Sequence, residues 1–154
     1  MARVVIGIGN GATEQLVMSS AVVAKAVALG MDVDIYLFQG GMRAFRRGAG
    51  IHRSLGDVRE TPLQSPVPDP FAPLQELRRT GRVHIHACPA EDKSTSPTRL
   101  RDFSPLVDDI VGLGSYVSNS EGKDVLHIYF GPCAEEHDME TRVEGPKKPA
   151  LRVL

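Results

Sequence analysis

The chain has 154 residues, of which 42% are hydrophobic and 24% charged, and its formal net charge is −1. This length suits one domain with its own core, and the composition is that of a globular protein, not a disordered one. The balanced charge and the 5% aromatic content, without a recognition motif, argue against nucleic-acid binding. The apolar run after Arg3 is too short for a signal peptide or membrane span, so we expect a cytoplasmic protein without membrane association.

The first third of the chain predicts a strand, a helix and a second strand. Residues 3–8 are mostly β-branched and end at a glycine-rich turn, as a buried strand does. An alanine-rich helix follows over about residues 13–29, and Gly30 ends it. The second strand covers residues 32–38. This spacing predicts two parallel strands with a right-handed crossover.

The middle of the chain predicts a short helix, a long loop, a helix and a third strand. The short helix covers residues 42–47. Residues 48–70 are rich in proline and glycine, and a loop insertion of this length is typical of a lid or an interface. A helix over residues 72–80 leads into a strand over residues 82–88.

The last third predicts a helix and a closing strand. Ser104 and Pro105 are a capping residue followed by a proline at the first helical position, so we expect a helix over residues 104–118. A strand over residues 124–130 follows. The element order therefore predicts an α/β protein, a single-domain Rossmann-like three-layer sandwich with a mainly parallel sheet over residues 1–130. Residues 131–154 form a C-terminal extension.

Ligands and reactive side chains in such sheets gather outside the carboxyl ends of the strands. By sequence position this edge collects one glycine-rich turn, one Gly-Gly pair and both cysteines of the chain. The residues concerned are Gly9, Asn10, Gly11, Gly40, Gly41, Arg43, Cys88 and Cys133.

Four stretches of the chain carry a family resemblance: VVIGIGNG, AVVAKAVALGMDVDIYLFQGGM, LQELRRTGRVHIHACPAE and LVDDIVGLGSYVSNSEGKDVLHIYF. In this order, spanning roughly residues 3–130, they resemble the DsrE/DsrF-like sulfur-relay family. The resemblance implies a homo-oligomer, such as a trimer or a hexamer. It also implies that Cys88 takes up sulfur as a persulfide or thiosulfonate, with a sulfur-carrier protein or a small sulfur anion as partner. Some relatives carry a second cysteine in the loop after the first, which residues 89–98 lack.

A sulfur carrier needs an accessible cysteine with a lowered pKa. Cys88 ends a strand and therefore fits this role, whereas the alternative is a buried structural cysteine. Cys133 follows another strand end, so it is either a resolving or acceptor thiol or an incidental thiol of the extension.

The histidines of the third strand suggest a metal site. His84, His86 and Cys88 alternate and face one side of a strand. With His127 and Cys133 they offer zinc ligands, but no ligand set is close in sequence and core or interface histidines are common, so we expect no metal. Alternatively, one of these histidines hydrogen-bonds a Cys88 persulfide.

Gly7, Gly9 and Gly11 suggest a phosphate loop, but the third glycine comes one residue early and no acidic residue follows the second strand. We therefore expect no nucleotide cofactor. The glycines at residues 9, 11, 40 and 41, together with Asn10, Arg43 and His86, are predicted to bind the substrate.

Residues 43–82 hold eight arginines against four acidic residues, a net charge of +4. Guanidinium groups of this kind bind sulfur oxyanions such as thiosulfate or sulfite, or an acidic carrier protein. The leading hypothesis is a sulfurtransferase-like carrier using Cys88. The alternative is a non-catalytic homo-oligomeric module that binds a small ligand, and a third is a metal-dependent enzyme.

Overall fold

The computed structural model describes residues 2–49, 68–89 and 98–131. The predicted loop insertion lies largely, and the C-terminal extension almost wholly, outside these residues, and so does Cys133.

One sheet of five strands, all parallel, forms the centre of the fold, in the order β4-β3-β2-β1-β5. Its strands are β1 (Arg3–Ile8), β2 (Asp32–Leu37), β3 (Val83–Ala87), β4 (Asp109–Ile110) and β5 (Val125–Phe130). The helices are α1 (Thr13–Ala28), α2 (Gln39–Ala44), α3 (Phe71–Arg78) and α4 (Leu113–Ser120), with a 3₁₀ turn η2 (Leu100–Asp102). The predicted α/β class and mainly parallel sheet are confirmed.

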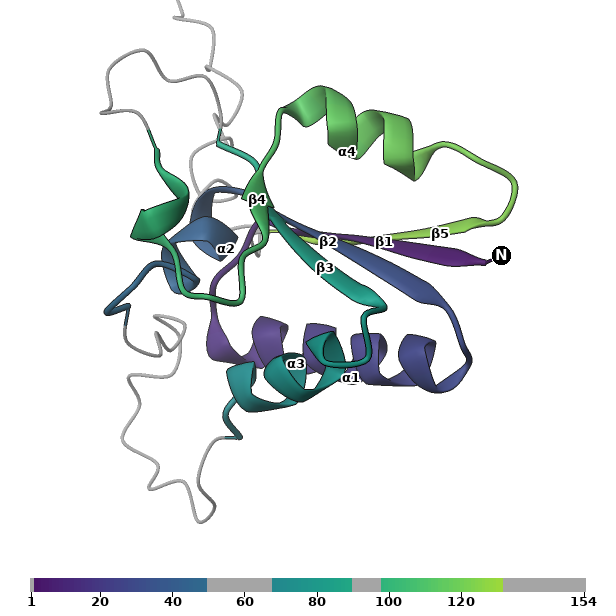
Figure 1. The fold of residues 1–154 in the computed structure, drawn as a ribbon, viewed down its shortest axis with the longest axis horizontal. Helices are drawn as coiled ribbons and strands as arrows, with labels where there is room; N and C mark the ends of the chain where they lie inside the picture. The colour runs from purple at the N-terminus through teal and green to yellow at the C-terminus, as the bar shows by residue number, and fades with distance from the viewer. Residues whose placement is uncertain (1, 50–67, 90–97, 132–154) are drawn as a thin grey trace, which may run out of the picture.

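The helices cover the sheet in layers. Figure 1 shows α1 and α3 on one face and α4 on the other, as the predicted three-layer sandwich requires. The chain moves from β1 through β2 and β3 to β4 and then returns past β1 to β5. Because crossovers between parallel strands are right-handed, a chain that reverses its direction along the sheet must change faces. This reversal explains why α4 lies on the face opposite to α1 and α3.

The two faces of the sheet differ in chemistry because side chains alternate along each strand. On the face covered by α1 and α3 the strands β1, β2 and β3 present only aliphatic side chains, all at most 2% exposed: Val4, Ile6, Ile8, Val33, Ile35, Leu37, Val83, Ile85 and Ala87. On the α4 face the central strands β2 and β3 present Asp34, Tyr36, His84 and His86. The core therefore lies on one side of the sheet, and the polar groups on the other.

The predicted helix over residues 104–118 is wrong in its first part and confirmed only from residue 113. Ser104 starts only one turn, in which the Val107 N–H donates to its carbonyl at 3.1 Å. The chain then forms the short edge strand β4, and α4 begins at Leu113. Asp108 explains the difference, because its carboxylate accepts the otherwise free N–H of Ile85 at 2.7 Å. Pairing with β3 thus outweighs the local helical signal.

The remaining predicted elements agree with the structure within a few residues, except that the short helix starts earlier, at Gln39. Among the described residues no helix is long and apolar enough to cross a membrane.

Gly41 allows α2 to approach the end of β1. A Cβ added there would collide with the backbone carbonyl oxygen of Ile8, which cannot move without disturbing the sheet. We expect Gly41→Ala to lower the free energy of unfolding by about 1–3 kcal/mol through overpacking. Gly114 in α4 is the matched control, because a Cβ there meets nothing within 4 Å. Urea denaturation of both variants checks this, and equal stabilities would contradict it.

Candidate functional site

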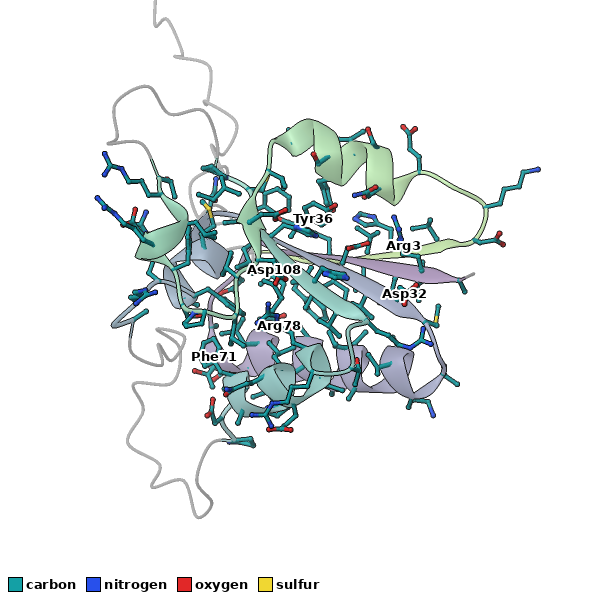
Figure 2. The ribbon with its side chains drawn as sticks, in the orientation of Figure 1. Arg3, Asp32, Tyr36, Phe71, Arg78 and Asp108 are labelled. Carbon is teal, nitrogen blue, oxygen red and sulfur yellow. The ribbon has the colours of Figure 1, made fainter. Side chains whose placement is uncertain are left out.

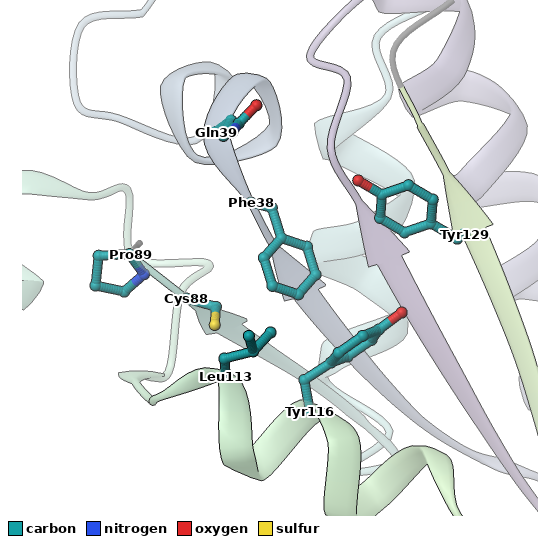
Figure 3. A pocket seen from close by; sticks show the side chains of 7 residues that line it. All are labelled: Phe38, Gln39, Cys88, Pro89, Leu113, Tyr116 and Tyr129. Atoms are coloured by element: carbon teal, nitrogen blue, oxygen red, sulfur yellow. The ribbon is translucent and has the colours of Figure 1, made fainter. Parts of the chain in front are cut away.

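A cavity of about 370 Å³ lies at the carboxyl ends of β2 and β3, next to the first turn of α4. Its lining is mostly aromatic and aliphatic and comes from α2, α4 and β5 and from the segments that follow β2 and β3 (Figure 3): Phe38, Gln39, Cys88, Pro89, Leu113, Tyr116 and Tyr129. The position is the one that the parallel sheet predicts for a binding site. The size lies within the range of small-molecule sites.

Cys88 directly follows β3, and in Figure 3 its sulfur points toward Leu113, with the Phe38 ring to one side. Its backbone N–H donates to the Leu37 carbonyl at 2.9 Å, which fixes the residue against the end of β2. Cys88 is only 2% exposed, and burial raises the pKa of its thiol above the ordinary value of 9.0. The expectation of an accessible thiol with a lowered pKa is therefore wrong for this structure. At neutral pH the group is a protonated thiol.

Aromatic rings form the walls of the cavity. The ring centroids of Phe38 and Tyr116 lie 4.9 Å apart in an edge-on arrangement, and Tyr129 lies 6.3 Å from Phe38. Gln39 has a φ of 32°, an uncommon conformation for a residue other than glycine. Such strain is often found at functional sites. Gln39, the residue with this conformation, lines the cavity.

Behind Tyr116, His86 bridges carboxylates from the two neighbouring strands. Its Nδ1 lies 2.5 Å from an Asp109 oxygen, and its Nε2 lies 3.4 Å from an Asp34 oxygen. The Tyr36 ring packs against the imidazole at 4.8 Å, and the Arg3 guanidinium lies 3.3 Å from Asp34. The cluster thus ties β3 to both β2 and the edge strand β4.

The charges in this cluster support one another. Burial works to lower the pKa of His86, but hydrogen bonds and charge from Asp34 and Asp109 together raise it above 6.5. Burial likewise works to raise the pKa of Asp34, whereas His86, Arg3 and His84 together lower it below 3.8. An imidazolium between ionised carboxylates is therefore the stable state in mildly acidic solution.

Polar side chains also hold α4 on the sheet. Tyr116 hydrogen-bonds His127 of β5, and the Asn119 amide donates to the Tyr36 hydroxyl. No residue of α4 is fully buried. The wall of the cavity that α4 provides is therefore fixed by a few polar and aromatic contacts and not by a buried apolar stripe.

The structure gathers most of the predicted edge residues, but few of them line the cavity. Gly9, Gly11, Gly40 and Gly41 bring the turns after β1 and β2 together, and the Gly40 N–H donates to the Gly9 carbonyl at 3.2 Å. The Asn10 side chain accepts the Ala12 N–H at the start of α1. Arg43 is exposed on α2, and His86 belongs to the carboxylate cluster. Of the predicted residues, only Cys88 lines the cavity among the described part of the chain.

Sequence reasoning missed Asp34, Tyr36, Asp109, Tyr116 and Tyr129. The alternation of Asp32, Asp34 and Tyr36 within an otherwise apolar strand was a usable signal, because a charged residue in a buried strand needs a partner. His86 on β3 supplied the complementary group, although its own register partner on β2 is Tyr36 and that of Asp34 is His84.

Within the described ranges no group of three or more histidine, cysteine or carboxylate side chains is placed to hold a metal ion. The chain matches no known family model, and no curated protein is significantly similar to it. The class of the protein, an α/β sandwich with an all-parallel five-stranded sheet, therefore comes from the fold alone.

The His86 cluster predicts a pH dependence of stability. Because the pKa of His86 is raised, its contribution to the free energy of unfolding is complete below about pH 6.5. This contribution is lost as the pH rises through the pKa of His86 in the folded protein. Because the pKa of Asp34 is lowered, its contribution is complete above about 3.8 and is lost as the pH falls. Both contributions are complete between these values, where His86→Gln should cost about 2 kcal/mol.

Urea denaturation from about pH 4 to pH 8 measures this effect. His84→Gln is the control for the hydrogen bonds, because His84 is exposed on the same face and makes none among the described residues. Since the charge of His84 also lowers the pKa of Asp34, we expect a smaller loss of stability than for His86→Gln. If the free energy of unfolding depends on pH in the same way for His86→Gln and the parent protein, the His86 cluster does not contribute to the pH dependence of stability.

Proposed function

We propose that the protein is a sulfur carrier that holds sulfur as a persulfide or thiosulfonate on Cys88 and passes it to a partner. The observation that supports this most is that the Cys88 sulfur faces a cavity at the carboxyl edge of the sheet. The sequence resemblance at this cysteine points to the same chemistry. A carrier whose resting thiol is reduced suits a reducing compartment, so we place its action in the cytoplasm.

The transfer step needs only the cysteine and a sulfur donor. The Cys88 thiolate attacks the outer sulfur of a donor persulfide R–S–SH and forms a new S–S bond. The S–S bond of the donor breaks, and its electron pair leaves with R–S⁻, so charge and oxidation level balance. Attack by an acceptor thiolate on the outer sulfur of the Cys88 persulfide reverses the roles and regenerates the Cys88 thiolate.

A mass measurement tests this proposal. After incubation with a low-molecular-weight persulfide, the intact protein should gain the mass of one sulfur atom at Cys88, and a reductant should remove it. Tetrathionate should add a thiosulfonate-sized group at the same residue. Because burial raises the pKa of this thiol, we expect faster modification as the pH rises toward and beyond 9.0.

Cys88→Ser should abolish the adduct and remain folded. Cys133→Ser is the matched control, since it removes the other cysteine, and it should alter at most the rate at which sulfur leaves. A fully reduced, folded parent protein that stays unmodified at Cys88 throughout the pH range would end the sulfur-carrier proposal.

A second candidate function is a module that binds a small apolar or aromatic ligand without catalysis. The observation in its favour is the combination of aromatic walls with a buried, protonated Cys88. In that case Leu113→Trp should fill the mouth of the cavity and weaken binding of an apolar fluorescent dye by about tenfold, or about 1.4 kcal/mol. Leu100→Trp is the control, because Leu100 is 44% exposed and does not line this cavity. Equal dye binding by both variants would argue against it.

We also propose that the protein forms a homo-oligomer through β5. This edge strand has no second partner strand among the described residues, and its Leu126 and Tyr129 side chains are 53% and 51% exposed. An apolar open edge of this kind favours association. Light scattering at micromolar concentration should therefore give a multimer that Leu126→Lys weakens. A monomeric parent protein would contradict the proposal.

A further inference from the structure

A second cavity, of about 380 Å³, lies on the side of α3 that faces the end of α2. Its lining comes from three segments and shares no residue with the Cys88 cavity: Ala44, Arg46, Arg47, Gly48, Ala49, Phe71, Gln75, Arg78, Ser104, Pro105 and Leu106. Arg46 and Arg47 from one segment and Arg78 from another, distant in sequence, therefore line the same cavity. The apolar part of the wall comes from Phe71 and Leu106.

Contacts with the protein hold each of the three guanidinium groups in place. Arg78 reaches from α3 to Asp108, as Figure 2 shows, and also donates to the Pro105 carbonyl at 3.0 Å. The Arg47 Nε donates to the Phe103 carbonyl at 2.9 Å, which leaves its two terminal nitrogens without a partner in the described structure. The Arg46 guanidinium lies over the Phe103 ring at 5.9 Å. These contacts reduce the entropy that a ligand would have to overcome.

The charge around this cavity is not balanced. None of its described lining residues is acidic, and only Arg78 has a carboxylate partner among the described residues. Asp69, which lies near the start of α3, instead accepts the N–H of Phe71. In addition, the Arg78 Nε is buried and has no hydrogen-bond partner within the described ranges. Two guanidinium charges, those of Arg46 and Arg47, therefore have no counter-charge from the part of the chain that the structure describes.

We propose that this cavity, which we name the arginine pocket, binds a dianionic tetrahedral oxyanion such as sulfate, thiosulfate or phosphate. Two unpaired guanidinium groups match the charge of a dianion, and their planar donors suit its oxygen atoms. The remaining volume accommodates water or the organic part of a larger ester. The proposal does not depend on Cys88, because the two cavities share no residue.

Titration calorimetry of the full chain with sulfate, thiosulfate and phosphate in separate arms tests the proposal, with chloride holding the ionic strength constant. We expect saturable binding of one equivalent of at least one of these anions. The anion that binds most tightly indicates which ligand the arginine pocket prefers. Arg46→Gln and Arg47→Gln should each weaken binding about tenfold, as the loss of a charged hydrogen bond implies. Both arginines are exposed, so these variants should fold.

Arg79→Gln is the matched control, because Arg79 neighbours Arg78 on the chain but is exposed, pairs with Glu76 and does not line the pocket. It should bind the anion as the parent protein does. Cys88→Ser should also bind normally, so failure of the sulfur-carrier proposal would leave this result unchanged. Anion effects that do not saturate, or that are equal in Arg46→Gln, Arg47→Gln and Arg79→Gln, would overturn the proposal, since sulfate and phosphate stabilise proteins generally.

Discussion

The separation of the two faces of the sheet rests on the two-residue period of β2 and β3. In β2 the residues Val33, Ile35 and Leu37 point toward α1 and α3, so the intervening Asp34 and Tyr36 must point toward α4. A shift of one residue would bury the carboxylate in the aliphatic core and expose the aliphatic side chains, which is why the register is strongly specified. The same period in β3 brings His86 beside Tyr36 and Cys88 to the carboxyl edge.

This arrangement gives the α4 face a different kind of cohesion from that of the core. The core face is stabilised by burial of aliphatic surface, which is not directional. The α4 face is held by the His86 cluster and by hydrogen bonds from Tyr116 and Asn119, which require particular geometries and protonation states. Because Asp109 is in β4 and only two residues separate the end of β4 from the start of α4 at Leu113, the His86 contact also anchors the start of α4. The shape of the Cys88 cavity is therefore linked to the protonation of His86.

The sequence predicted those strands and helices whose position depends on neighbouring residues, and failed where contacts between distant residues decide the structure. The β-branched runs and glycine stops placed β1, β2, β3 and β5 within about two residues, and the crossover rule predicted the parallel arrangement. The helix predicted from Ser104 failed because Asp108 satisfies a free N–H of β3, a contact between residues 23 positions apart. The burial of Cys88 was missed for a similar reason. A strand-end position does not reveal that Phe38, Leu113 and Tyr116, from other parts of the chain, line the same cavity as Cys88.

The buried thiol constrains how sulfur transfer would work at Cys88. A higher thiol pKa lowers the fraction of thiolate, but it also makes the thiolate that forms more nucleophilic. His86 points from the same face of β3, yet it is held between Asp34 and Asp109, so its protonated form is stabilised and it is a poor base for the thiol. The proton acceptor must then come with the donor or from water. An added sulfur would lie about 2.05 Å beyond the Cys88 sulfur. That distance brings it into the cavity beside Phe38 and Leu113, where an acceptor thiol must enter to remove it.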